Sequence, residues 1–168
     1  VRVPAQNMVG QLNQGWTVAK GLLGFERLNS GTPRRPQFPL NKARQIAQQR
    51  GLWDDPDFRA RYTRLEMDVH DLGIVFGLYA GIVSGGGHPG PDISQLKIWS
   101  SETTMRLNAL MMEAAGGAGA VADDLDFGNG VVADVFGGYC MMFPGLIASG
   151  TNDIQRNVLS KRVLGLPG

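Results

Sequence analysis

A carboxylate stands on an otherwise apolar helical stripe near the beginning of the chain. Glu26 follows Trp16, Ala19 and Leu23 at helical spacing, which predicts that the four side chains share one buried face. A carboxylate in such a place either pairs with a basic group, here the adjacent Arg27, or acts as a general base in an apolar pocket. Residue types and spacing by themselves favour the structural pairing over the catalytic role.

Two further segments could hold a polar or anionic ligand. Gly116 and Gly117 lie in EAAGGAG, where paired glycines let a phosphate approach backbone N–H groups, although they equally suit the end of a helix. Thr151 in SGTNDIQRN suits a helix N-cap, beyond which free N–H groups can bind an anion. Each signal is weak alone because many helix ends share these residue types.

The elements that would position these residues are helices. Apolar side chains at alternating steps of four and three predict a long helix over residues 55–83, and its seam is expected to pack against a second helix over 91–116. Two more helices are predicted over 13–29, with Asn13 as cap, and after Thr151. A short helix over 40–50 is expected within the proline-broken segment 30–51. Because no strand pattern competes, the sequence predicts an all-α, up-and-down four-helix bundle forming one domain over residues 1–168.

Composition excludes several classes of function. The 168 residues carry a net charge of +1, so nucleic acid is not an expected partner, and the basic side chains between residues 34 and 50 are better explained as a solvated face than as a phosphate site. Cys140 with two histidines gives no metal-ligand cluster and suits a reducing, cytoplasmic setting. No apolar run reaches the roughly 20 residues of a spanning helix, so no membrane contact is expected.

Three stretches together resemble a known family. The opening VPAQNMVGQLNQGWTVAKGLLGFER, the central EAAGGAG and the closing IASGTNDIQRNVLSKRVLGLP are similar, in this order, to the C-terminal helical domain of acyl-CoA dehydrogenases. The resemblance implies an FAD-dependent oxidation of an acyl-CoA thioester to the trans-2-enoyl-CoA. It also implies that the family's N-terminal helical domain and middle β-domain are absent from this chain, so that residues 1–168 alone would bind FAD weakly and be inactive.

The resemblance assigns roles to individual residues. Ser149 stands where many members have the catalytic glutamate, and its hydroxyl cannot serve as that base at neutral pH. A smaller group of members has the glutamate on the first helix of the domain, where the triplet FER places Glu26, so Glu26 becomes the candidate base. Gly116 and Gly117 match the pair that approaches the flavin diphosphate. Thr151 and Asp153 match two polar positions on the adenosine side or the diphosphate of the cofactor.

One departure leaves an alternative open. Typical members continue from the first helix into an Arg-x-x-Phe-Gly segment that reaches the flavin of a neighbouring subunit, and residues 30–51 do not show it. Bacterial members that act on bulky or steroid side-chain acyl-CoAs are similar in this respect. A homo-oligomer or a heteromer with another dehydrogenase subunit is therefore expected. The alternatives are a noncatalytic subunit or oligomerisation module of a heteromer, or an acyl-CoA oxidase on the same scaffold.

Overall fold

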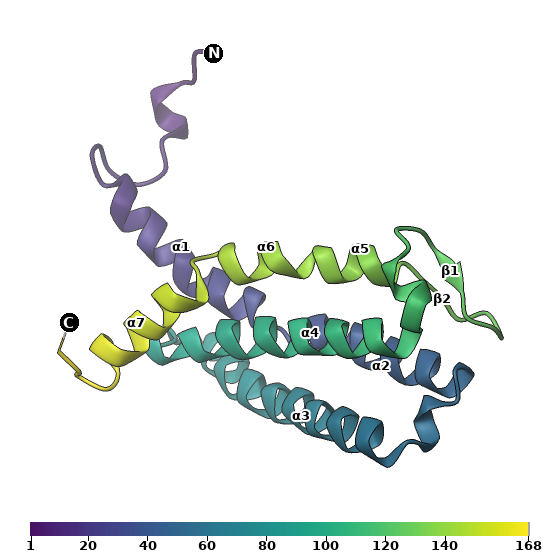
Figure 1. The fold of residues 1–168 in the computed structure, drawn as a ribbon. Coiled ribbons are helices and arrows are strands. Elements are labelled where there is room, and N and C mark those ends of the chain that lie inside the picture. The colour runs from purple at the N-terminus through teal and green to yellow at the C-terminus, as the bar shows by residue number, and fades with distance from the viewer. Residues whose placement is uncertain (168) are drawn as a thin grey trace.

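A computed structural model describes residues 1–167 of the protein, and helices dominate it (Figure 1). Helix α4 (Ser94–Ala115) is the central element, and every other α-helix contacts it. These helices are α1 (Gly15–Ser30), α2 (Arg34–Gln49), α3 (Pro56–Ser84), α5 (Val135–Cys140), α6 (Met142–Ile147) and α7 (Asn152–Arg162). The predicted all-α bundle is confirmed.

The long helix α3 begins and ends as its sequence predicts. Asp55 caps it, since its Oδ1 accepts a hydrogen bond from Asp57 N at 2.9 Å, and Pro56 occupies the first helical position, where a missing N–H costs nothing. Gly85 follows the last turn. Most of the predicted seam is buried, and it packs against α4 as expected. A helix with these caps needs tertiary contacts only on that seam.

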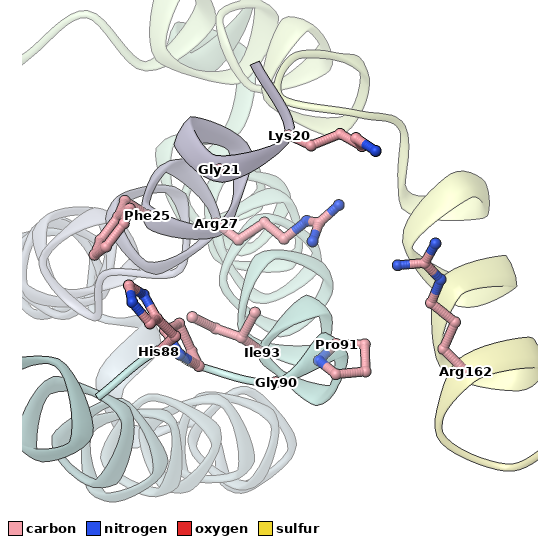
Figure 2. A pocket seen from close by; sticks show the side chains of 10 residues that line it. Lys20, Gly21, Phe25, Arg27, His88, Gly90, Pro91, Ile93 and Arg162 are labelled. Atoms are coloured by element: carbon pink, nitrogen blue, oxygen red, sulfur yellow. The ribbon is translucent and has the colours of Figure 1, made fainter. Parts of the chain in front are cut away.

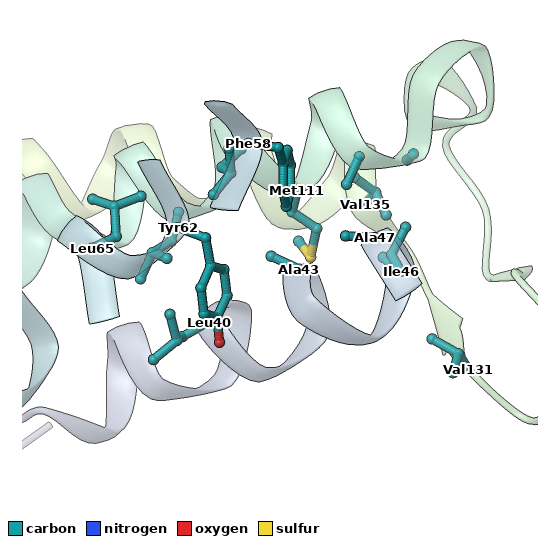
Figure 3. Packing of buried hydrophobic residues seen from close by; sticks show 14 of the residues in the cluster. Leu40, Ala43, Ile46, Ala47, Phe58, Tyr62, Leu65, Met111, Val131 and Val135 are labelled. Carbon is teal, nitrogen blue, oxygen red and sulfur yellow. The ribbon is translucent and has the colours of Figure 1, made fainter. Parts of the chain in front are cut away.

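Two apolar clusters hold the bundle together. The larger one joins α2, α3 and α4 and includes the fully buried Phe58 and Ile46 (Figure 3). The smaller one joins Leu72 and Tyr79 of α3 to Ile93 and Leu96, and Leu28 of α1 packs against it. Burying a large apolar side chain contributes about 1.5–3 kcal/mol. The seam of α3 therefore fixes two neighbouring elements at once.

Several local predictions are wrong. Helix α2 is continuous from Arg34 and far longer than the expected 40–50. Pro36 falls in the first turn, whose N–H groups have no intrahelical partner, and the helix continues through Pro39, which lies inside it and is buried. Asn13 is not a cap; it has a φ of +67°, and Gln14 precedes the helix without a side-chain bond. A two-stranded antiparallel hairpin, β1 (Leu125–Asp126) and β2 (Val132–Ala133), and the short helices α5 and α6 were not predicted.

The expected absence of a membrane-spanning length also needs correction. Helix α3 is long and apolar enough to cross a membrane by length and composition. That test is equally passed by helices that pack against protein, and the seam of α3 does so here. On its other side α3 exposes the large apolar side chains Met67, Ile74, Leu78 and Ile82. We call these four exposed side chains the outer stripe of α3, because they lie on the side of the helix away from its buried seam.

The end of α1 approaches α4 so closely that only glycine fits. A Cβ added at Gly31 would overlap the Cβ of Leu96 and lie 3.1 Å from its carbonyl carbon. Gly31→Ala is therefore expected to lower the free energy of unfolding by about 2 kcal/mol through overpacking. Gly77→Ala is the matched control, because no atom lies within 4 Å of its added Cβ and alanine is the better helix former by about 1 kcal/mol. Urea denaturation of both variants checks this, and an unchanged midpoint for Gly31→Ala would contradict the close packing.

Candidate functional site

The predicted glycine pair lies at the C-terminal end of α4 with a basic side chain beside it. Gly116 ends the helix with a φ of +59°, and an added Cβ at Gly117 would meet no atom within 4 Å. Arg50 Nη2 donates a hydrogen bond of 3.2 Å to the carbonyl oxygen of Ala115. The N–H of Gly116 is engaged within α4, where it donates to the carbonyl oxygens of Met112 and Glu113. The group at this end of α4 that could face an anion is therefore the Arg50 guanidinium. Residue type and spacing predict Arg50 only as part of a solvated basic face.

Thr151 and Asp153 lie at the opposite side of the bundle, where α7 begins. Thr151 Oγ1 accepts a hydrogen bond of 3.2 Å from Ile154 N, which confirms the predicted N-cap. Both residues line a hollow of about 640 Å³ between α4, α6 and α7. Ser149 and Gly150 precede the cap with φ angles of +58° and +84°. The chain therefore turns sharply just before the helix.

A buried polar network that the sequence did not reveal fixes this turn. Lys97 of α4 is 1% exposed, and its Nζ donates to Asn152 Oδ1 at 2.6 Å and to the Leu146 carbonyl at 2.9 Å. Asn152 Nδ2 donates in turn to Ser101 Oγ at 3.1 Å and Glu102 Oε1 at 3.0 Å. Burial lowers the pKa of Lys97. By helical spacing Lys97 lies with Ser94, Ser100 and Ser101 on a face of small polar residues. Such a face gives no sequence signal that the lysine is buried.

The structure does not bring the two predicted cofactor segments together. Asn152 bonds to Ser101 and Glu102, whereas Gly116 follows the last turn of the same helix. Fourteen residues of α-helix, from Glu102 to Gly116, span about 20 Å. A single diphosphate group therefore cannot contact both segments within one chain.

Glu26 occupies a different environment from the one its spacing predicts. The expected apolar face is not buried, since Trp16 is 70% exposed and Leu23 is only half-buried. Ser30 at the C-terminal end of helix α1 is buried, whereas most side chains of its first turns are exposed. Glu26 itself is half-buried. The ion pairs among residues 1–167 do not include Glu26 or Arg27, so the alternative in which these two pair is wrong.

A second polar contact fixes the entry to α4. Tyr79 Oη donates to Asp92 Oδ2 at 2.5 Å and accepts from Gln95 Nε2 at 2.8 Å. Burial, followed by the bond to Asp92, raises the pKa of Tyr79 to about 12. This contact ties α3 to the 3₁₀ turn Pro91–Ile93 that precedes α4.

The raised pKa of Tyr79 predicts how stability depends on alkaline pH. An unfolded tyrosine releases its proton near pH 10, so between about pH 10 and 12 the unfolded state binds fewer protons than the folded state, and stability falls as pH rises. Tyr79→Phe is expected to remove this part of the decline. Urea midpoints of both proteins at about pH 9 and about pH 11 measure it. An equal decline in the two proteins would contradict the assignment to Tyr79.

Comparison with known sequences identifies the family. The family described as "Acyl-CoA dehydrogenase, C-terminal domain" matches residues 13–164. The chain is 30% identical over 168 residues to acyl-CoA dehydrogenase IpdE1 of Mycolicibacterium smegmatis and 28% identical over 167 residues to acyl-CoA dehydrogenase FadE34 of Mycobacterium tuberculosis. Each match covers 99% of this chain but 40% and 22% of those proteins, respectively. The chain therefore spans less than half the length of these relatives.

Solved structures share the fold. A variant of the steroid acyl-CoA dehydrogenase Tcur3481-Tcur3483 superimposes with a TM-score of 0.85 at 20% identity, covering 100% of this chain and 44% of that one. The ChsE4-ChsE5 complex from Mycobacterium tuberculosis gives 0.80 at 24% identity, covering 99% and 44%. With nine-tenths of its residues inside the family match, the chain belongs to the acyl-CoA dehydrogenase family, whose C-terminal domain it represents.

Proposed function

We propose that the protein carrying this chain is an FAD-dependent acyl-CoA dehydrogenase that forms a trans-2-enoyl-CoA, with Glu26 as the base. The observation that carries the proposal is a half-buried carboxylate without an ion-pair partner, on a helix whose end is locked against α4 at Gly31. A base needs a free carboxylate on a rigid support. The other position from which the family supplies this group is Ser149, which offers no carboxylate.

The residues present suit an FAD cofactor. The Arg50 guanidinium would hold the diphosphate, and Gly116 and Gly117 would leave room for it beside the end of α4. Thr151 and Asp153 would contact the adenosine side from the hollow at the start of α7. When bound, FAD supplies an acceptor for the β-hydrogen as hydride.

The work of the chain itself is proton transfer and positioning. Glu26 would accept the α-proton of the thioester, and the electron pair of the broken C–H bond would form the new double bond. The α-carbon is only weakly acidic, so the carboxylate must be held against it with water excluded. Because Glu26 is only half-buried in this chain, we propose that the domains which precede this one in the family complete the enclosure.

Assembly of more than one subunit is part of the proposal. The two cofactor segments lie about 20 Å apart along α4, so one cofactor would take its diphosphate contacts from one chain and its remaining contacts from another. Related structures include a complex of two named chains, ChsE4 and ChsE5, and a steroid dehydrogenase. We therefore propose a homo-oligomer or heteromer in the cytoplasm that acts on a bulky acyl-CoA.

The outer stripe of α3 is the proposed subunit contact. Ile74, Leu78 and Ile82 follow one another at a spacing of four and are all exposed, which forms a continuous apolar strip. Leu78→Glu places a charge in its middle and is expected to dissociate the oligomer. Sedimentation velocity measures this, with Gln48→Glu as the control, because it adds the same single charge at an exposed position of α2. A monomeric parent protein, or an unchanged Leu78→Glu oligomer, would refute the contact.

Two observations favour a second candidate function. The cofactor segments at Gly116 and at Thr151 lie far apart within one chain, and Ser149 offers no carboxylate. In a heteromer the chain could serve as a noncatalytic subunit that lends Gly116 and Arg50 to a partner's cofactor. The test is to purify the protein with any co-encoded dehydrogenase chain, record its flavin absorbance, and add acyl-CoA without oxygen. Bleaching that depends on Glu26 supports the catalytic role, whereas bleaching that depends only on a glutamate of the partner supports the noncatalytic role.

A further inference from the structure

A row of glycines runs along α3 beside the outer stripe. Leu78 of the stripe is 66% exposed, and Ile74 and Ile82 lie one turn before and one turn after it. The neighbouring row has the same spacing of four residues and consists of Gly73, Gly77 and Gly81. A Cβ added at any of these three glycines would meet no described atom within 4 Å beyond its own helical turn. An apolar ridge and an open groove therefore lie side by side on one face of the helix.

Nothing in the described chain requires these three glycines. Glycine in a helix interior lowers helix stability relative to alanine, because it loses more backbone freedom on folding. At Gly31 the close contact with Leu96 excludes any side chain, but the space over Gly73, Gly77 and Gly81 would accept a methyl group. Small residues at a spacing of four let the backbone of another helix approach closely. The glycine row is therefore explained by a neighbour that is not among residues 1–167.

The segments nearest to the outer stripe lead away from it. The segment that follows α3 turns towards α1, where the ring of His88 packs edge-on against Phe25 at 6.0 Å. There it lines a pocket of about 340 Å³ between α1 and α7, together with Lys20, Arg27 and Arg162 (Figure 2). The chain begins on the opposite side of α4 from α3 (Figure 1), so a domain that precedes Val1 would be joined across the bundle from the outer stripe. Another subunit is therefore the neighbour that the fold favours.

The charge pattern of α3 favours a partner with the same kind of face. No Lys, Arg, Asp or Glu lies between Asp71 and Asp92, whereas the N-terminal half of α3 exposes Arg59, Arg64 and Glu66. A contact through the C-terminal half therefore buries no charge if the partner is also uncharged there. A second copy of this half meets that condition. Two helices that cross there diverge towards their charged halves, which stay in water.

The ridge and the groove of α3 are complementary to each other. Ridges formed by residues four apart pack into the matching grooves of a second helix at a crossing angle of about 50°. A two-fold axis that runs between the two rows exchanges them, so that the ridge of each copy meets the glycine row of the other. Leu78 then lies opposite Gly81 of the second copy, and Ile74 lies opposite its Gly77. Each of these pairs occurs twice, because the contact is symmetric.

We propose that α3 binds α3 of a second copy of this chain through this symmetric contact, with Leu78 of each copy over Gly81 of the other. The inference rests on the subunit contact proposed above for the outer stripe, and it names the partner as an identical chain rather than a different dehydrogenase chain. It does not depend on flavin or acyl-CoA.

Exchange of the two central residues tests the proposal. Gly81→Leu places a second leucine opposite Leu78, and Leu78→Gly leaves a gap at the same place. Each single substitution is expected to weaken self-association of the protein that carries this chain at least about tenfold, because the change occurs twice in a symmetric contact. The double variant Leu78→Gly with Gly81→Leu places leucine opposite glycine again, so its dissociation constant is expected to return to within about threefold of the parent value. Sedimentation equilibrium measures these constants.

Two controls guard against misfolding and unspecific association. The double variant has the same composition as the parent, and circular dichroism must show that all variants keep their helices. Ala60→Leu adds a leucine at an exposed position of α3, about 30 Å from Gly81 along the helix. It is expected to leave the dissociation constant within about twofold. The exchange Ile74→Gly with Gly77→Leu repeats the test one turn away.

The outcomes separate this inference from the proposals on which it rests. If Leu78→Glu dissociates the protein but neither exchange restores association, α3 contacts a different chain and the self-pairing is overturned. If Leu78→Glu has no effect, the subunit contact itself fails. Flavin reduction is not part of the measurement, so failure of the proposed dehydrogenase activity would leave the result unchanged.

Discussion

Replacing Glu26 with Gln in the flavin-loaded protein is expected to slow reduction of the flavin by acyl-CoA about 10²–10⁴-fold, while flavin binding persists. Glutamine keeps the shape and the hydrogen-bonding size of the side chain but cannot take the α-proton, and general-base catalysis typically contributes a factor of this size. The half-buried site tolerates the amide because no ion pair there depends on the charge. Stopped-flow absorbance in the absence of oxygen measures the rate.

Glu66→Gln provides the control for this experiment. Glu66 is an exposed carboxylate on α3 outside the ion pairs of the described chain, so its loss changes net charge equally without touching the proposed site. If Glu26→Gln reduces its flavin at nearly the parent rate, the base lies elsewhere. Adding Ser149→Glu to the Glu26→Gln variant extends the test, because partial recovery would mean that the two positions reach the same α-carbon.

Asn152→Ala is expected to destabilise the protein by about 3 kcal/mol. Asn152 Oδ1 accepts from the buried Lys97 ammonium at 2.6 Å, and its Nδ2 donates to Ser101 and Glu102. Removal of the amide leaves the Lys97 Nζ with only the Leu146 carbonyl, and hydrogen bonds to charged groups are worth about 1.5–3 kcal/mol before the loss of the other two is added. For a domain of this size the thermal midpoint should fall by roughly 6–12 °C.

Asn157→Ala is the matched control on the same helix. Asn157 is exposed, and it is its backbone carbonyl that accepts a hydrogen bond from Ser160 Oγ, a bond that alanine retains. Its effect should stay within about 0.5 kcal/mol, as for other surface substitutions. Calorimetric melting of the two variants gives the comparison, and equal midpoints would show that the Lys97–Asn152 network does not hold α7 in place. The Asn152→Ala variant should also bind flavin more weakly than the parent protein, because the Lys97–Asn152 network positions the neighbouring Thr151.

The sequence determined the elements whose signals are local. The seam residues of α3, its Asp55 cap and its glycine-rich end fix that helix from within a few residues of each other, and Thr151 caps α7 as its residue type predicts. The three stretches that resemble the family carry its identity in their order along the chain, and the match over residues 13–164 bears this out. Such features depend on spacing and residue type, which a sequence states directly.

Tertiary structure alone decided what those elements bring together. Spacing placed Glu26 on an apolar stripe, but burial of a stripe requires a neighbour, and Trp16 in the first turn of α1 is 70% exposed here. Pro36 and Pro39 indicate a break in the helix by residue type, but Pro36 lies in the first turn of α2 and the helix continues through the buried Pro39. The approach of Arg162 to Lys20 and Arg27, and the contact of Lys97 with Asn152, join residues 55 to 142 positions apart. Such contacts follow from how the helices cross α4, a geometry set by the packing of all of them at once.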